Sequence, residues 1–562
     1  MKKNRKKERS AKPGARRRDW MPLLILALII LATLLLYGRT LYYDYTFLDD
    51  NELILKNQHI LRHFSNIVYA FKEDVFFGYH DAYYRPLLTT SFILDGQFGV
   101  ASLFPFHATN LIIHILCAWL IFIVLRRLTI ARGMAVFFAL LFTLHPVLSQ
   151  AVAWVPGRND SLLTLFVLLS FLMLLHYLGR PRWSFYALHV FFFALALFTK
   201  ETVLLFVVVC IVYLYLIVRP EKPKAFLLPL GLGWSLVALL YLVMRSAAMV
   251  HPVSYSFMQM IYSTWISLPV LLQFLGKIFF PFNLSVLPTM LDTTCLYGVA
   301  AMALLILGAW WRRATADWMM IAFGAVWFLL FIIPSFIRPN ADILGNFLEH
   351  RTYLPIIGIF LIISGLLKGL DLSTKRIIMT GVIILLTMSI LTIRHVPHFK
   401  NRLVFWNNAA LHSPHSPLAQ RNLGAMLYLE GDHERAAHYF RRALALNPEE
   451  PMANMNLGLI AMDNNQLAAA ESLFVREATI NPFYANVYFN LGILNYKKGC
   501  IDNAANAWEK TIQLDGNFAS AYYNLIVLFY ENNRLESARA CLRMLQDRNM
   551  PIPPELAQMV GF

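Results

Sequence analysis

The sequence predicts an all-α protein, in which a polytopic membrane bundle of about eleven helical spans is followed by an α-solenoid of helical repeats. Of the 562 residues, 58% are hydrophobic and only 15% are charged, which is far from the composition of a soluble domain. Apolar residues form long runs from Trp20 to about Ile393, whereas the sequence after about Pro397 is polar and has a helical period. This change of composition is the main domain boundary.

Composition divides the chain into four parts. Residues 1–19 form a basic cytoplasmic tail, and residues 20–395 form a multi-span membrane domain whose first outer loop covers residues 41–105. Residues 396–416 are predicted to be a linker, and residues 417–550 carry about four repeats of 34 residues.

Eleven apolar runs are long enough to cross a bilayer as helices. The first has no site of the signal-peptidase type after it and is predicted to be a retained anchor with its amino end in the cytoplasm. Another run, at about 262–281, is ambiguous because it contains Gln273 and Lys277. If this run lies along or dips into the outer interface without crossing, the basic loops all fall on the cytoplasmic side, as the positive-inside rule requires. The eleven runs lie at about 20–38, 107–125, 134–152, 161–178, 183–199, 202–218, 226–244, 296–311, 318–337, 352–368 and 376–393.

The net charge of +16 does not indicate a nucleic-acid partner. Ten Lys or Arg lie within the first 18 residues, and most others lie in short loops between apolar runs, where they are expected to face lipid headgroups. The five cysteines have no paired spacing, so they predict neither disulfides nor a zinc site.

The carboxyl part repeats with a period of 34 residues, because the pair Asn-Leu recurs at Asn422, Asn456, Asn490 and Asn524. Alanines keep the same step at Ala436, Ala470, Ala504 and Ala538. This pattern resembles the tetratricopeptide repeat (TPR), in which two helices per unit meet at small residues. Stacked units give a concave groove suited to a peptide or protein partner. A passive spacer or a dimerisation module is the alternative.

The first outer loop begins with two adjacent acids, Asp49 and Asp50, about a dozen residues beyond the first span. Acids so close to a bilayer are candidates for function, although a solvated loop without chemistry is the alternative. Arg85 follows in the same loop, and a guanidinium at the interface can form a bidentate pair with a phosphate.

Further polar groups collect on the same predicted face. The third span ends at His145-Pro146, and the next one begins near Arg158 and Asp160. The positive-inside rule does not explain an outer Arg158, whose alternative role is a charged anchor at the membrane end. Several outer cations near a carboxylate pair indicate a site for an anionic headgroup. The remaining members of this set are Lys200, Glu201, Glu349, Arg351 and Tyr353.

These motifs, in this order, resemble the transmembrane-and-TPR (TMTC) O-mannosyltransferases and their bacterial relatives, within the GT-C class of glycosyltransferases that use polyprenyl-phosphate sugars. The resemblance covers nearly the whole chain, although the animal members carry longer repeat arrays. The motifs that carry it are Phe47-Leu48-Asp49-Asp50, Tyr84-Arg85-Pro86-Leu87, His145-Pro146-Val147, Gly157-Arg158-Asn159-Asp160, Lys200-Glu201 and Glu349-His350-Arg351-Thr352-Tyr353.

The resemblance implies transfer of a sugar, such as mannose, from a polyprenyl-phosphate donor to a Ser or Thr hydroxyl of a protein on the outer face. Asp49 or Asp50 would act as the general base, and the residues alone do not decide which. Cations would stabilise the leaving phosphate, so no metal or other cofactor is invoked. The expected phosphate-binding residues are Arg85, Arg158, Lys200 and Arg351, and the expected supporting residues are His145, Asp160, Glu201, Glu349 and Tyr353.

Two other functions remain open at this point. An envelope polysaccharide ligase or polymerase also uses polyprenyl-linked sugars, but its large outer loop is expected late in the membrane domain. A non-enzymatic membrane-anchored TPR scaffold would leave the outward acids and cations unexplained. The compact repeat array favours a bacterial inner-membrane protein with periplasmic repeats; in a eukaryotic cell the same topology predicts the endoplasmic reticulum with luminal repeats.

Overall fold

The computed structural model describes residues 20–77, 83–249, 256–337 and 345–561. The basic tail, residues 1–19, therefore lies outside the described residues. The described ranges contain helices joined by turns and loops, with no strand and one isolated β-bridge between Thr289 and Asn346. The all-α prediction is thus confirmed for these residues.

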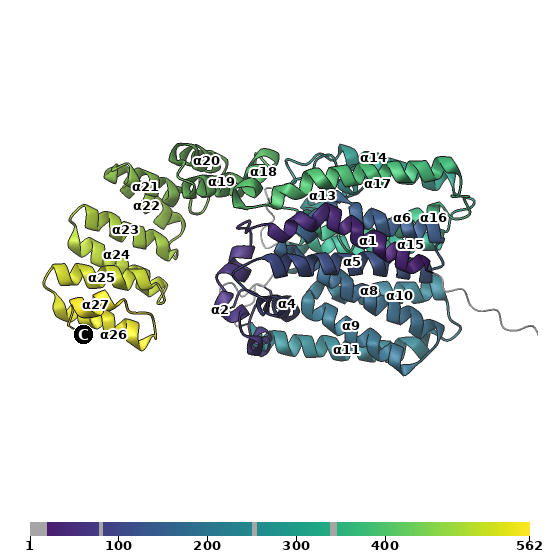
Figure 1. Cartoon of the computed structure of the whole chain (residues 1–562), viewed down its shortest axis with the longest axis horizontal. Helices are drawn as coiled ribbons and strands as arrows, with labels where there is room; N and C mark the ends of the chain where they lie inside the picture. The colour runs from purple at the N-terminus through teal and green to yellow at the C-terminus, as the bar shows by residue number, and fades with distance from the viewer. Residues whose placement is uncertain (1–19, 78–82, 250–255, 338–344, 562) are drawn as a thin grey trace, which may run out of the picture.

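The membrane domain is a bundle of long apolar helices (Figure 1). Seven helical segments of the described chain are long and apolar enough to cross a membrane, and the number rises to nine if each of two bent pairs is one span. Three shorter apolar helices complete the bundle. The eleven predicted runs therefore all contain an apolar helix, but their lengths do not reproduce a count of eleven full spans. The helices are α1 (Met21–Tyr37), α5 (Phe104–Arg127), α6 (Arg132–Leu144), α7 (Ser149–Ala153), α8 (Arg158–Gly179), α9 (Trp183–Thr199), α10 (Leu204–Tyr213), α11 (Pro223–Ala248), α13 (Leu268–Phe279), α14 (Leu296–Trp311), α15 (Trp318–Ile332), α16 (Ile356–Leu366) and α17 (Lys375–His395).

Proline explains why one predicted span is broken. The run at about 134–152 bends by 52° between α6 and the segment Pro146–Ala153. Pro146 has no N–H to donate, and the residue before it, His145, takes extended backbone angles. The break leaves irregular backbone at the end of the bundle that carries the first outer loop.

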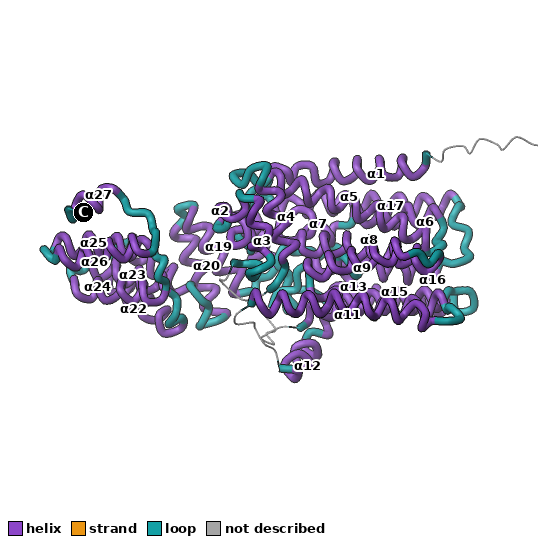
Figure 2. Tube along the Cα trace, turned by 90° about the horizontal axis from the view of Figure 1, so that it is seen from below, coloured by secondary structure: helices purple, strands orange, loops and turns teal. Residues whose placement is uncertain are grey.

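The ambiguous run is also a bent pair. Helix α12 (Phe257–Ile266) meets α13 at 49°. Helix α13 packs closely on α14, because a Cβ on Gly276 would lie 2.7 Å from the backbone nitrogen of Gly298. Helix α12 instead projects from the bundle (Figure 2), and its apolar side chains are exposed, Phe257 by 74% and Trp265 by 71%. A bent, exposed apolar helix fits a segment that dips into a membrane interface.

The first outer loop folds into short helices that pack on the end of the bundle. A small core unites Leu53 and Ile54 of the loop with Phe92 of α4 and Phe106 of α5. The loop elements are η1 (Gly38–Tyr42), η2 (Asn51–Leu55), α2 (Gln58–Leu61), η3 (Phe64–Asn66), α3 (Ile67–Ala70) and α4 (Pro86–Gly96).

The repeat domain consists of antiparallel helix pairs, as the 34-residue period predicts. In the second pair, Gly458 allows close packing because a Cβ there would lie 2.6 Å from the ring of Phe474. A larger residue at Gly458 would therefore separate the two helices. The helices are α19 (Pro417–Leu429), α20 (His433–Leu446), α21 (Ala453–Asp463), α22 (Leu467–Ile480), α23 (Ala485–Lys497), α24 (Ile501–Leu514), α25 (Ala519–Glu531), α26 (Leu535–Asp547) and α27 (Pro554–Met559).

The predicted linker contains a helix that joins the two domains. After η10 (Val396–Phe399), α18 (Arg402–His412) begins where the side chain of Asn401 accepts a hydrogen bond of 3.0 Å from the Val404 N–H. Phe405, Trp406 and Ala409 on this helix are buried. The repeat domain therefore leaves the bundle at the same end as the first outer loop (Figure 1).

Candidate active site

Asp50 is a buried carboxyl group in the first outer loop. Its side chain is 2% exposed, and its Oδ2 accepts hydrogen bonds from the backbone N–H of Thr46 at 2.6 Å and from the Thr46 hydroxyl at 2.8 Å. Burial raises the pKa of Asp50 to about 7, although the bonds from Thr46 oppose this shift. The group therefore changes its charge near neutral pH.

Asp49, its neighbour, is exposed to solvent. Its φ of 64° lies in the left-handed region, which non-glycine residues seldom adopt. The two bonds between Thr46 and Asp50 close the turn that contains this conformation. One acid of the pair thus stabilises the turn, and the other is exposed.

Two tryptophans, one in the membrane domain and one on α18, donate hydrogen bonds to the loop that carries Asp49 and Asp50. The indole Nε1 of Trp154 donates a hydrogen bond of 3.0 Å to the carbonyl oxygen of Leu48. The indole Nε1 of Trp406, on α18, donates one of 2.9 Å to the carbonyl oxygen of Thr46. The acid loop is therefore fixed by the membrane domain and by the helix that leads into the repeats.

A cluster of charges lies where α4, α8 and α9 begin or end. The Nζ of Lys200 lies 2.9 Å from each carboxylate oxygen of Asp160, and the Nη2 of Arg85 lies 3.2 Å from Oε1 of Glu201. The imidazole Nε2 of His350 lies 3.5 Å from Oδ2 of Asp160. We call Arg85, Asp160, Lys200, Glu201, His350 and Arg351 the cation cluster.

Arg351 belongs to this cluster because its charge interacts with Asp160 and Arg85. Its Nη1 also donates a hydrogen bond of 3.1 Å to the carbonyl oxygen of Ser335. Burial lowers the pKa of His350 to about 3, more than Asp160 raises it, so the imidazole is neutral. Three cations then face two carboxylates, and the cluster has a net positive charge that suits a phosphate.

Trp154 connects the acid loop to the cation cluster. Its ring contacts that of His350 at a tilt of 46°, with 5.5 Å between the centroids, while its Nε1 donates a hydrogen bond to the carbonyl oxygen of Leu48. Gln150, one turn earlier, accepts a hydrogen bond of 3.2 Å from the backbone N–H of His350. The acid loop and the cation cluster thus contact one structural unit.

Arg158 lies in a separate network. It is fully buried, and its guanidinium contacts Asp95 at 2.5 Å, Asn110 at 2.7 Å and the carbonyl oxygen of Phe106 at 2.5 Å. It ties α4, α5 and α8 together. These contacts describe a structural role, so we omit Arg158 from the donor site proposed below.

Glu349 lies in another buried network, although it directly precedes His350. Its Oε1 accepts hydrogen bonds from Lys277 Nζ at 2.6 Å and from the Ser285 N–H at 3.0 Å. Its Oε2 lies 3.4 Å from Nε2 of His395. Glu349 thereby attaches α13 and α17 to the loop that carries the cation cluster.

His145 and Tyr353 also have structural partners. The Nε2 of His145 bonds to the carbonyl oxygen of Ile278 at 2.8 Å. The hydroxyl of Tyr353 bonds to Nδ1 of His114 at 2.7 Å inside the bundle. Both side chains therefore have partners within the protein that fix their positions.

Within the described residues, no group of three or more His, Cys, Asp or Glu is arranged to hold a metal ion. A cavity of about 510 Å³ lies between α18 and the first repeat. It is lined by apolar and polar side chains, among them Leu403, Asn407, His412, Leu423, Leu427 and Arg435.

Four residues at the site were not singled out from the sequence as site residues: Thr46, Trp154, His350 and Trp406. His350 lies inside a motif quoted above and Trp154 lies between two of them, so their positions carried a signal. Trp406 lies in the predicted linker, where no motif marks it. Only the tertiary contact with Thr46 reveals it.

Comparison with known proteins gives two family matches. Residues 94–250 match the family described as dolichyl-phosphate-mannose-protein mannosyltransferase. Residues 427–485 and 489–551 match a tetratricopeptide repeat family. The first match contains Asp160, Lys200 and Glu201 and begins after the acid loop.

Curated relatives agree with these matches. Protein O-mannosyl-transferase TMTC1 of Mus musculus is 32% identical over 205 residues, which are 33% of this chain and 21% of that protein. Protein O-mannosyl-transferase TMTC3 of Homo sapiens is 30% identical over 187 residues, 32% of this chain and 20% of that protein. Protein O-mannosyl-transferase Tmtc1 of Drosophila melanogaster is 30% identical over 133 residues, 24% of this chain and 15% of that protein. The matched part thus spans about a fifth of these relatives' length.

Among solved structures, MamA 41-end from Desulfovibrio magneticus RS-1 is 21% identical and covers 27% of this chain and 84% of that chain, with a TM-score of 0.23. Residues 94–250 of this chain are thus similar to a mannosyltransferase family and its carboxyl part to tetratricopeptide repeats, in a chain whose described residues include seven to nine helical segments apolar enough to cross a membrane.

Proposed function

We propose that this protein is a membrane glycosyltransferase that moves a sugar from a polyprenyl-phosphate donor to a Ser or Thr hydroxyl of a protein acceptor. The observation that carries the proposal is the arrangement around Trp154, which joins the acid loop to a net-positive cluster of partly buried charges. The names of the relatives and of the matched family favour mannose as the sugar and a lipid phosphate as the carrier.

The chemistry needs one base and one group that stabilises a leaving phosphate. The acceptor oxygen attacks the anomeric carbon, and a new carbon–oxygen bond forms as the bond to the phosphate oxygen breaks. The electron pair stays on the departing lipid phosphate, and the hydroxyl proton moves to a carboxylate. Attack from the face opposite the leaving group inverts the anomeric configuration.

We assign the base to Asp49, because its carboxylate is exposed whereas that of Asp50 is buried. Asp50 stabilises the turn through Thr46 and, when ionised, raises the basicity of Asp49 by like-charge repulsion. Arg85, Lys200 and Arg351 are the candidates for holding the phosphate, since a guanidinium or ammonium in a largely buried site stabilises developing negative charge.

The repeat domain is proposed to present the acceptor. It leaves the bundle at the end that carries the acid loop, and α18 contacts the loop through Trp406. An acceptor held along the repeats would therefore lie near Asp49, and we place this side of the bundle outside the cytoplasmic membrane.

The proposal is tested with the purified full-length protein in nanodiscs, polyprenyl-phosphate mannose and a Ser/Thr-containing polypeptide. Mass spectrometry should detect one hexose per modified hydroxyl, and the linkage should have the anomeric configuration opposite to that of the donor. Transfer to a glycan alone would favour the polysaccharide ligase or polymerase. Absence of transfer from any lipid-linked sugar, with intact acceptor binding, would favour the scaffold.

A further inference from the structure

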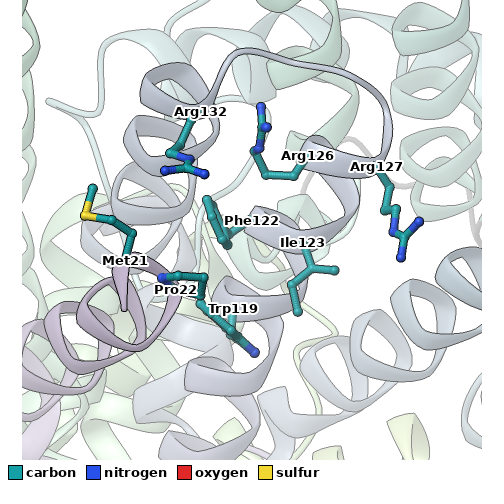
Figure 3. A pocket seen from close by; sticks show the side chains of 8 residues that line it. All are labelled: Met21, Pro22, Trp119, Phe122, Ile123, Arg126, Arg127 and Arg132. Carbon is teal, nitrogen blue, oxygen red and sulfur yellow. The ribbon is translucent and has the colours of Figure 1, made fainter. Parts of the chain in front are cut away.

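A second candidate site lies at the end of the bundle opposite the acid loop. Here the amino end of α1 meets the turn between α5 and α6 around a cavity of about 430 Å³ (Figure 3). Apolar side chains and three arginines line it: Met21, Pro22, Trp119, Phe122, Ile123, Arg126, Arg127 and Arg132.

The local fold brings two of the arginines to the same cavity. Helix α5 ends at Arg127, and Thr129 takes a φ of 62°, so the chain reverses within four residues before α6 begins at Arg132. Nη1 of Arg126 donates a hydrogen bond of 2.6 Å to the carbonyl oxygen of Ile130, which fixes this side chain across the turn. In Figure 3, Arg126 and Arg132 lie on the side of Phe122, whereas Arg127 is directed away from them.

The surroundings add to the positive potential. The amino ends of α1 and α6 both meet the cavity, and a helix amino end carries a partial positive charge. The site therefore favours an anion.

The lining and the neighbouring surface indicate what kind of anion binds. Below the arginines, the wall consists of Trp119 and Phe122, whose rings stack with 5.5 Å between centroids. Beyond the cavity, the outer face of α1 exposes a ridge of leucines along the membrane domain: Leu23, Leu24, Leu28, Leu31 and Leu35. A phosphate next to an apolar ridge is the chemistry of a phospholipid at a membrane surface.

We propose that this cavity binds the phosphate of an anionic phospholipid, with Arg126 and Arg132 on the headgroup and the acyl chains along α1. The competing explanation is that these arginines only orient the protein in the membrane by the positive-inside rule. That explanation requires positive charge on this side of the membrane, but it does not predict that an anionic lipid binds at the cavity more tightly than at other basic loops.

The test uses the purified full-length protein and native mass spectrometry with phosphatidylglycerol or phosphatidylcholine added in equal amounts. The wild-type protein should retain phosphatidylglycerol in preference. The double variant Arg126→Gln/Arg132→Gln should bind it roughly 30-fold more weakly, because each arginine near a membrane surface contributes a factor of about five. The matched control, Arg180→Gln/Arg182→Gln, removes two exposed arginines from another loop and should retain the preference.

Three results would overturn the proposal: equal retention of the two lipids by the wild-type protein, equal loss in both double variants, or displacement of the lipid by millimolar inorganic phosphate. The last result would assign the site to a soluble phosphate. Unchanged melting temperatures of both variants show that any loss of binding is not a loss of fold. The outcome does not depend on the proposed transferase activity.

Discussion

Trp406 donates a hydrogen bond of 2.9 Å from its indole nitrogen to the carbonyl oxygen of Thr46, although 360 residues separate them. Thr46 in turn donates two hydrogen bonds to the carboxylate of Asp50. Helix α18 at the base of the repeat domain is therefore part of the structure that holds the acids. A repeat domain used only as a remote spacer would not need this contact.

Trp406→Phe tests the contact. The substitution keeps an aromatic ring but leaves the Thr46 carbonyl without its indole partner, at a cost of about 1–3 kcal/mol. We expect turnover to fall by about tenfold or more, because small displacements of a catalytic group reduce rates strongly. Initial rates and melting temperatures of the variant, measured side by side, separate the loss of rate from the loss of stability.

Trp508→Phe is the matched control. Trp508 is also buried and donates a hydrogen bond of 3.1 Å to the carbonyl oxygen of Phe489, within the repeats and away from the loop. Trp508→Phe should lose about as much stability as Trp406→Phe, but its turnover should equal that of the wild type. Equal rates in the two variants would remove α18 from the site.

The pH dependence should report on Asp50, whose pKa burial raises to about 7. Ionised Asp50 holds Thr46 more firmly and makes Asp49 more basic, so kcat/KM should rise with pH and have an inflection near 7. In Asp50→Asn the amide oxygen still accepts the bonds from Thr46, but the inflection should be absent. A wild-type-like profile in this variant would show that another group titrates.

The same group affects stability with the opposite sign. Since its folded-state pKa is raised, Asp50 contributes most stability below its unfolded pKa of about 4. That contribution is lost as pH rises through about 7. Melting temperatures of the wild type should therefore fall relative to those of Asp50→Asn between pH 5 and 8, values chosen to bracket the transition.

The pair Lys200–Asp160 should behave as a buried ion pair. Lys200→Met leaves Asp160 in a buried site without its ammonium partner, which should destabilise the protein by about 3 kcal/mol. Lys200→Met/Asp160→Asn should lose much less than the sum of the two single variants. Titration with a denaturing detergent gives the free energies of unfolding of the wild type, the two single variants and the double variant.

An exposed pair serves as the reference for this cycle. Lys368 and Asp317 are 2.7 Å apart, and the lysine side chain is 65% exposed. Lys368→Met should cost less than about 1 kcal/mol. Similar losses for the two lysines would mean that the Lys200 pair is hydrated and not part of a buried site.

Sequence patterns predicted the elements of this fold because each pattern has a local cause. The 34-residue step places small residues such as Gly458 against rings such as Phe474, and the apolar runs determine the bundle helices. Breaks were harder to predict. The bend at Pro146 follows from that proline and the projection of α12 from a second bend, and apolar composition alone marks neither.

The site was predicted less completely, because motifs mark where polar residues lie but not their partners. Arg158 and Lys200 looked alike as unexplained cations, yet Arg158 bonds to Asp95 inside the bundle and Lys200 belongs to the cation cluster. Glu349 and Arg351, two residues apart, similarly lie in different networks. These assignments depend on contacts between residues far apart in the sequence.

The central claim is that Asp49 removes the acceptor proton, and one comparison of variants tests it most directly. Initial rates of mannose transfer are measured for the wild type, Asp49→Asn and Asp44→Asn, which alters another exposed acid of the same loop. Asp49→Asn should lose about 10²–10⁴-fold in kcat, with unchanged melting temperature, while Asp44→Asn stays within a few-fold of wild type. Transfer by Asp49→Asn at the wild-type rate would contradict the account.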